Sequence, residues 1–180
     1  MKISLCYSTT NALYSKVIRW ITKANVSHVY IRFYDETLGT DMILHSDMPG
    51  VVFNMAEIFS IKNFTTEEYE IEDERLKEAI KNNLWHLGKS YHYFKLIDWA
   101  VFIIFKRWLV RKIKNPVSNP KKLICVDFVL FILNDAGITH LPIGLMTPID
   151  LLQWCKENYE KLGWKRKVFD DTPDWLKGAA

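Results

Sequence analysis

Apolar and polar residues alternate at the start of the chain, with apolar side chains at positions 3, 5 and 7. A two-residue repeat places its apolar members on one face of an extended strand, so we expect a short strand here. Across 12–24 the apolar residues recur at helical spacing, and Asn11 stands where it would cap a helix. The pattern therefore predicts a strand followed by a helix.

Residues 26–34 carry the strongest strand signal in the chain, because β-branched and aromatic side chains dominate them. The alternation puts Val29, Ile31 and Phe33 on one face of this strand and His28 on the opposite face. We therefore expect His28 to point away from the apolar face.

More strands and then several helices are predicted along the rest of the chain. The further strands are 42–45 and 51–53, on either side of a turn at Met48-Pro49-Gly50, and 64–71. The helices are 73–87 ending at Gly88, 92–113, 121–135 ending at Gly137, and one from Pro148 to about 160. Strands followed by helices favour an α+β fold, with an antiparallel sheet packed against helices.

The composition fits one globular domain spanning 1–180. The 180 residues are 49% apolar and 14% aromatic, which provides enough side chains for a substantial core. A net charge of +3 is too small to indicate nucleic-acid binding. The three cysteines form neither a disulfide framework nor a short-spaced zinc pattern, so we expect no metal and no cofactor.

The pattern of apolar runs predicts a cytoplasmic protein. The N-terminus lacks the apolar core of a signal peptide, and the most apolar stretch, Trp99 to Phe105, is far shorter than a membrane span of roughly 18 residues. A basic cluster up to Lys112 follows that stretch. Trp99 to Lys112 is therefore a candidate for peripheral contact with an anionic membrane, although a core helix with a solvated basic end gives the same pattern.

Cys125 is the candidate nucleophile, because it stands at or just inside the start of an apolar helix. The positive end of a helix and the nearby Lys121 and Lys122 would both stabilise a thiolate. The alternative is a small core residue, since cysteine is among the most buried residue types. Cys6 and Cys155 have no such surroundings, and we expect both to pack in the core.

His28 is the candidate base for that thiol. A base needs a fixed position on a rigid element and a third group that holds its second ring nitrogen. His45, on the next predicted strand, fits the third role across neighbouring strands. Asp47 and Glu57 are the alternatives for it.

The order of these motifs resembles the circularly permuted NlpC-type, papain-like cysteine hydrolases, which are related to lecithin-retinol acyltransferase-like proteins. The segments that carry the resemblance lie within about 1–155, and they are Ser27-His28-Val29-Tyr30-Ile31, Leu87-Gly88-Lys89-Ser90-Tyr91-His92-Tyr93, Ile124-Cys125-Val126-Asp127-Phe128-Val129 and Met146-Thr147-Pro148-Ile149-Asp150-Leu151. The resemblance implies a papain-like fold in which the histidine strand precedes the cysteine helix.

By this resemblance Cys125 matches the nucleophile, His28 the base, and His45 the residue that orients the base. Ser27, Tyr91 and Asp127 stand in the same motif segments, and we predict that they contact the substrate. Val126 and Asp127 depart from the family, which often has serine and then glutamate after its nucleophile.

Three functions follow from the sequence. The first is hydrolysis of an amide or peptide bond, including cell-wall peptides, by a Cys nucleophile and a His base. The second is lipid acyl transfer or hydrolysis at a membrane surface. The third is a non-catalytic binding module of the same fold, because a fold does not fix a function.

Overall fold

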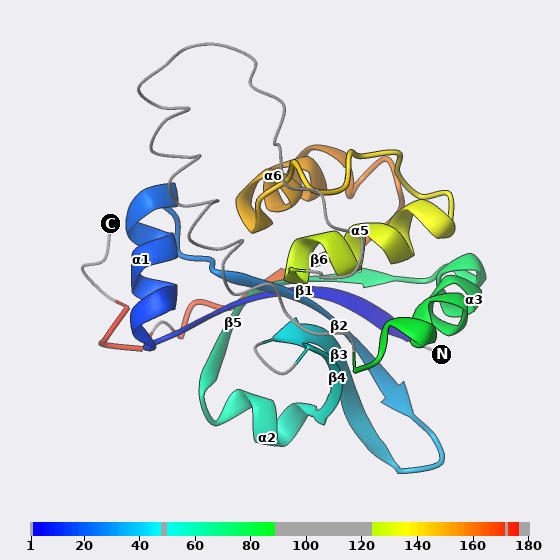
Figure 1. The fold of residues 1–180 in the computed structure, drawn as a ribbon, viewed down its shortest axis with the longest axis horizontal. Coiled ribbons are helices and arrows are strands. Elements are labelled where there is room, and N and C mark those ends of the chain that lie inside the picture. The colour runs from blue at the N-terminus through cyan, green and yellow to red at the C-terminus, as the bar shows by residue number, and fades with distance from the viewer. Residues whose placement is uncertain (1, 48–49, 89–123, 172, 177–180) are drawn as a thin grey trace.

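The computed structural model describes residues 2–47, 50–88, 124–171 and 173–176. A six-stranded sheet lies at its centre, in the order β4-β3-β2-β1-β5-β6, and all neighbouring strands are antiparallel (Figure 1). The strands are β1 (Ile3–Thr10), β2 (His28–Asp35), β3 (Thr40–Asp47), β4 (Gly50–Met55), β5 (Asn63–Ile71) and β6 (Lys165–Val168). The helices are α1 (Leu13–Thr22), α2 (Ala56–Ser60), α3 (Glu74–Asn83), η1 (Leu84–His86, a 3-10 turn), α5 (Cys125–Asp135) and α6 (Pro148–Asn158). The α+β class with an antiparallel sheet is confirmed.

Helices cover the two faces of the sheet unequally. Because strand side chains alternate, Leu5, Val29 and Leu44 face one side, where α3, α5 and α6 lie and the main core forms (Figure 1). The opposite face carries a smaller cluster around Tyr30, covered by Phe59 of α2. His28 belongs to this second face, as the alternation predicts.

Helix α5 is the most deeply buried helix that the structure describes. Its residues from Cys125 to Leu130 are all buried, so the helix is covered on every side rather than along one apolar stripe. The helix ends as predicted, because Gly137 has a φ of 65° and its neighbour Ile138 donates its N–H back to the Leu133 carbonyl. This buried helix fixes the position of Cys125 at its first residue.

Helix α6 begins as the sequence predicts. The Thr147 hydroxyl accepts a hydrogen bond from the Asp150 N–H, the Asp150 carboxylate accepts one from the Thr147 N–H, and Pro148 occupies the first turn. This capping box holds the N-terminus of α6 at the edge of the site described below.

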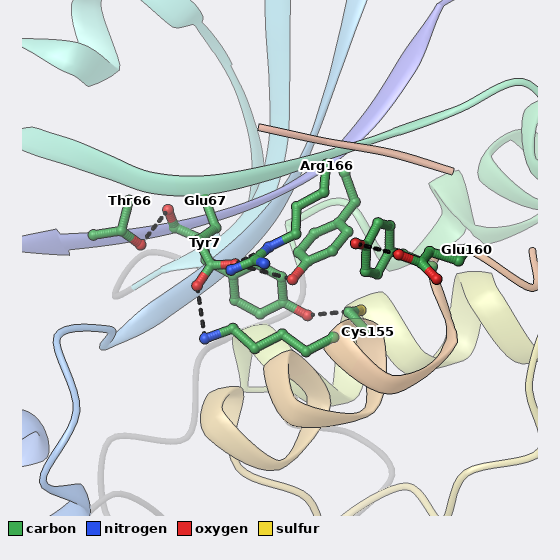
Figure 2. Close-up of polar contacts among 9 residues, drawn as sticks. Tyr7, Thr66, Glu67, Cys155, Glu160 and Arg166 are labelled. Carbon is green, nitrogen blue, oxygen red and sulfur yellow. Dashed lines mark hydrogen bonds and ion pairs between the residues drawn. The ribbon is translucent and has the colours of Figure 1, made fainter. Parts of the chain in front are cut away.

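An ion-pair network joins helix α6 to strands β5 and β6 of the sheet (Figure 2). The buried Glu67 carboxylate accepts hydrogen bonds from Tyr69 Oη, Lys156 Nζ and Arg166 Nε, each at 2.9 Å. Burial alone would raise the pKa of Glu67, but these three donors outweigh it and leave the pKa below its usual value. The same carboxylate therefore joins a strand, a helix and the C-terminal strand.

Cys6 and Cys155 are core residues, as predicted, and both are buried. The Tyr7 hydroxyl lies 3.2 Å from Cys155 Sγ, which links β1 to α6 beside the Glu67 network (Figure 2). Burial raises the pKa of Cys155 to about 12, so its thiol is protonated at neutral pH.

Four details differ from the sequence predictions. The residue that caps α1 is Ala12 rather than Asn11, and it makes no side-chain cap. Helix α3 ends at Asn83 and continues only as a 3-10 turn, so Gly88 lies beyond the helix and donates its N–H to Val51 instead. The short helix α2 and the strand β6 were not predicted.

The apolar stripe of α1 faces outward. Leu13 and Trp20 are more than three-quarters exposed, whereas Ser15 and Arg19 are buried against the molecule. The helical spacing predicts the helix correctly but not which of its faces is buried. The buried face is the polar one, because the Ser15 hydroxyl makes hydrogen bonds with the hydroxyls of Thr9 and Ser27. In the part of the chain that the structure describes, no helix has both the length and the apolarity to cross a bilayer.

Candidate active site

Three of the predicted site residues, Ser27, His28 and Cys125, line one pocket at an end of the sheet. The pocket lies where β1 ends and β2 begins, against the N-termini of α5 and α6. Both His28, the first residue of β2, and Cys125, the first residue of α5, line it. The other described residues that line it are Thr10, Tyr14, Ile18, Ser27, Asp47, Phe59, Asn63, Ile124 and Pro148.

Cys125 is the first residue of α5 and is only 5% exposed. Burial is the main cause that raises the pKa of its thiol to about 12, and the nearby Asp127 and Asp47 carboxylates raise it further. Hydrogen bonds from the backbone of Val29 and Val126 act in the opposite direction. The resting thiol is therefore protonated, and its sulfur accepts a hydrogen bond from the backbone of Val29, the residue that follows His28 in β2.

His28, His45 and Asn54 form a continuous chain of polar contacts across three strands. His28 Nε2 lies 3.1 Å from His45 Nδ1, and His45 Nε2 lies 2.8 Å from Asn54 Nδ2. His45 stands directly opposite Val52 in the β3–β4 ladder, so Asn54 is its diagonal neighbour on the same face. Rings of Phe59 and Tyr30 pack around this chain on the α2 side.

The remaining ring nitrogen of His28, Nδ1, makes no hydrogen bond within the described ranges. Burial lowers the pKa of His28 well below its ordinary value, and the neighbouring His45 lowers it further. Burial also lowers the pKa of His45, although Asp47 opposes this. Both rings are therefore neutral at pH 7, and Nδ1 is the ring nitrogen of His28 that His45 does not engage.

Stability should depend on pH through this histidine pair. An unfolded histidine takes up a proton near pH 6.5, whereas the folded His28 resists it, so the unfolded chain binds more protons as the pH falls. The free energy of unfolding should then fall below pH 6.5, by up to about 1.4 kcal/mol per pH unit for His28 alone. Urea titrations at pH 7.5, 6.5 and 5.5 measure this slope.

The His28→Gln variant should have a shallower pH slope than the natural chain. His140→Gln provides the control, because His140 is exposed and should leave the slope unchanged. A slope that is the same in all three proteins would contradict the assignment of buried neutral rings.

The predicted substrate-binding residues lie in different surroundings. Ser27 lines the pocket, and its hydroxyl lies 2.6 Å from the Ser15 hydroxyl in a buried cluster with Thr9. Asp127 is buried one residue beyond Val126, and its carboxylate accepts a hydrogen bond from the Gly144 N–H at 2.8 Å. Asp127 therefore anchors the loop before α6 and is not among the described residues that line the pocket. Tyr91 and the segment Trp99 to Lys112 fall outside the described residues.

Three residues of this site were not assigned a main role from the sequence. Asn54 extends the histidine chain. Tyr14 lines the pocket, where burial raises the pKa of its hydroxyl and the nearby Asp47 carboxylate raises it further. Asp47, an alternative for the third role, lines the pocket without replacing His45 beside His28. Glu57, the other alternative, is exposed on α2. Among the described residues no cluster of three or more His, Cys, Asp or Glu has the arrangement of a metal site.

Comparison with protein-family models gives no match, and comparison with curated proteins gives none at a significant level.

Proposed function

We propose that this protein is a cysteine hydrolase that cleaves an amide or peptide bond, built on a permuted, NlpC-type papain-like fold. The observation that carries the proposal is that Cys125, at the first residue of a helix, lines the same pocket as His28, the first member of the His28–His45–Asn54 chain. A thiol nucleophile needs a base, and the base needs a third group that orients it. These side chains supply all three roles on rigid elements.

The reaction would proceed in two halves. His28 Nδ1 takes the proton of the Cys125 thiol while the sulfur forms a bond to the carbonyl carbon of the substrate. The bond to the leaving group then breaks, and the imidazolium gives the leaving group its proton. Water, deprotonated by His28, attacks the thioester, and the acid is released with the sulfur protonated again.

The electrostatics favour proton transfer during attack rather than before it. Burial opposes a charge on Cys125 and on His28 alike, so a preformed thiolate–imidazolium pair is disfavoured in the empty pocket. The N–H groups in the first turn of α5 have no backbone carbonyl partner within the helix, and they point at its N-terminal end, where the Cys125 thiol lies. They are suited to stabilise the oxyanion that develops on the carbonyl oxygen, an effect worth about 3 kcal/mol per donor.

The test is acylation by an activated ester. The protein is mixed with p-nitrophenyl acetate, and release of p-nitrophenolate is followed while the protein is digested and analysed by mass spectrometry. We expect an initial burst and an acetyl group on the peptide that contains Cys125. Acetylation confined to surface lysines, with no burst and no adduct on Cys125, would overturn the proposal.

A non-catalytic binding module is the second candidate, and the depth of Cys125 is the observation that favours it. A structural cysteine is buried and inert, whereas a nucleophile must reach a substrate carbonyl. The same acylation experiment separates the two functions, because a module would leave Cys125 unacylated even when the ester is in large excess.

A further inference from the structure

A neutral histidine ring has one nitrogen that donates and one that accepts, and this constrains the chain of His28, His45 and Asn54. In the arrangement observed, Asn54 Nδ2 faces His45 Nε2 and donates to it. His45 must then carry its proton on Nδ1 and donate to His28 Nε2. His28 in turn carries its proton on Nδ1, so the nitrogen that His45 does not engage has no lone pair with which to accept the thiol proton.

A half-turn of the Asn54 amide reverses every bond in this chain. The rotation puts Oδ1 where Nδ2 was, at nearly the same distance from the ring, because the amide oxygen and nitrogen are almost the same size. His45 Nε2–H then donates to Oδ1, and His28 Nε2–H donates to His45 Nδ1. His28 Nδ1 is left with a free lone pair, which is the form that a base needs.

We propose that Asn54 is a positioning residue that sets the tautomer of His28 through His45, and that its amide oxygen faces His45 in the reactive form. The inference rests on the proposed function, since it specifies which state of the site is active. It follows from the two contacts of 3.1 Å and 2.8 Å and from the donor and acceptor rules alone. The observed orientation is then the resting form.

The groups that face this chain are known from each element packed against it. His28 comes from β2, Asp47 comes from the end of β3, and Phe59 comes from α2 with an apolar ring. Of these, only Asp47 has an effect that raises the pKa of His45. A substitution at position 54 would therefore change the tautomer of His28 through the hydrogen bonds that link Asn54 to His45 and His45 to His28.

Two substitutions at position 54 test the inference in opposite directions. Asn54→Asp supplies a carboxylate, which only accepts and so holds the reactive tautomer. Asn54→Leu has a similar volume and makes no hydrogen bond. With p-nitrophenyl acetate we expect Asn54→Asp to keep kcat/KM within about threefold of the natural chain, and Asn54→Leu to lose about 100-fold, since a wrong tautomer has cost as much as 10⁴-fold in the serine protease triad.

The pH profile gives a readout that a merely structural role would not move. The new charge in Asn54→Asp favours the imidazolium form, so the acid limb of its kcat/KM profile should shift to higher pH. Asn25→Asp is the matched control, because it adds the same charge at an exposed position before β2 and should leave the profile unchanged.

The tautomers can also be observed without any substrate. Long-range ¹H–¹⁵N NMR spectra distinguish a ring protonated on Nδ1 from one protonated on Nε2. In Asn54→Asp we expect His28 to be protonated on Nε2, whereas the natural chain should show the Nδ1–H form at rest.

Four outcomes of these experiments would contradict a specific claim. If Asn54→Asp and Asn54→Leu are equally inactive while both fold normally, or if the His28 tautomer is the same in all variants, the role of Asn54 is overturned. If Asn54→Leu keeps full activity, it is overturned as well. If Cys125→Ala keeps full activity, the proposed function itself fails, whatever the tautomers show.

Discussion

Replacing Cys125 by alanine is expected to reduce kcat/KM for p-nitrophenyl acetate by at least about 10⁴-fold, because no other described side chain in the pocket can form the thioester. His28→Ala should lose about 10²- to 10⁴-fold, the usual contribution of a general base. The two losses should not add, since nucleophile and base act as a unit. Initial rates of p-nitrophenolate release measure all three variants, including the double substitution.

Cys6→Ala is the control for the loss of a thiol. Cys6 is as buried as Cys125, but it lies in the middle of β1 and does not line the pocket. The rate of ester hydrolysis by Cys6→Ala should therefore stay close to that of the natural chain. Circular dichroism melts show whether each variant is folded. A folded Cys125→Ala that turns over ester at the natural rate, or a folded Cys6→Ala that does not, would refute the assignment of the nucleophile.

The strands could be predicted because their signal is local. Apolar and polar residues alternate in β1 and β2 because one face of each strand is buried. This alternation predicts both strands to within about two residues of their observed bounds. The same alternation put His28 on the face away from Val29. The sequence does not predict strand β6, because the strand is four residues long and all four are exposed, so no alternation of apolar and polar residues marks it.

Asn54 could not be found from the sequence, for a different reason. A strand pattern assigns residues to faces, but contacts between strands depend on register, and register is set by the turn and the packing. His45 lies opposite Val52, which makes Asn54 its diagonal neighbour. A register shifted by one residue would have turned that amide to the other face of the sheet.

The direction of α1 shows a second limit of sequence patterns. Hydrophobic periodicity predicts that the apolar stripe is buried, yet Leu13 and Trp20 are exposed and Ser15 is buried. The Ser15 hydroxyl lies 3.1 Å from the Thr9 hydroxyl and 2.6 Å from the Ser27 hydroxyl, in a cluster that joins α1, β1 and the residue before β2. Hydrogen bonds between hydroxyls have no periodic signature, so such a cluster is invisible in the sequence.

The largest effect on stability is expected from Phe128→Ala. Phe128 lies one turn after Cys125 in α5, is fully buried, and contacts the His86 ring edge-to-face. Removing its ring costs both the transfer free energy and the cavity left behind, about 4 kcal/mol, because the surrounding sheet and helices cannot collapse into the space. For a chain of 180 residues this corresponds to a fall in Tm of about 10 °C.

Phe53→Ala is the matched control for the same change in a different environment. Phe53 lies on β4, is 37% exposed and contacts the Phe33 ring edge-to-face, so its loss should cost about 1 kcal/mol. Urea denaturation of both variants measures their free energies of unfolding. The dependence of this free energy on urea concentration should be the same for the two variants, which shows that their unfolded states are comparable. Equal losses at the two positions would mean that α5 is not packed against the sheet as described, and the rigid placement of Cys125 beside β2 would lose its physical basis.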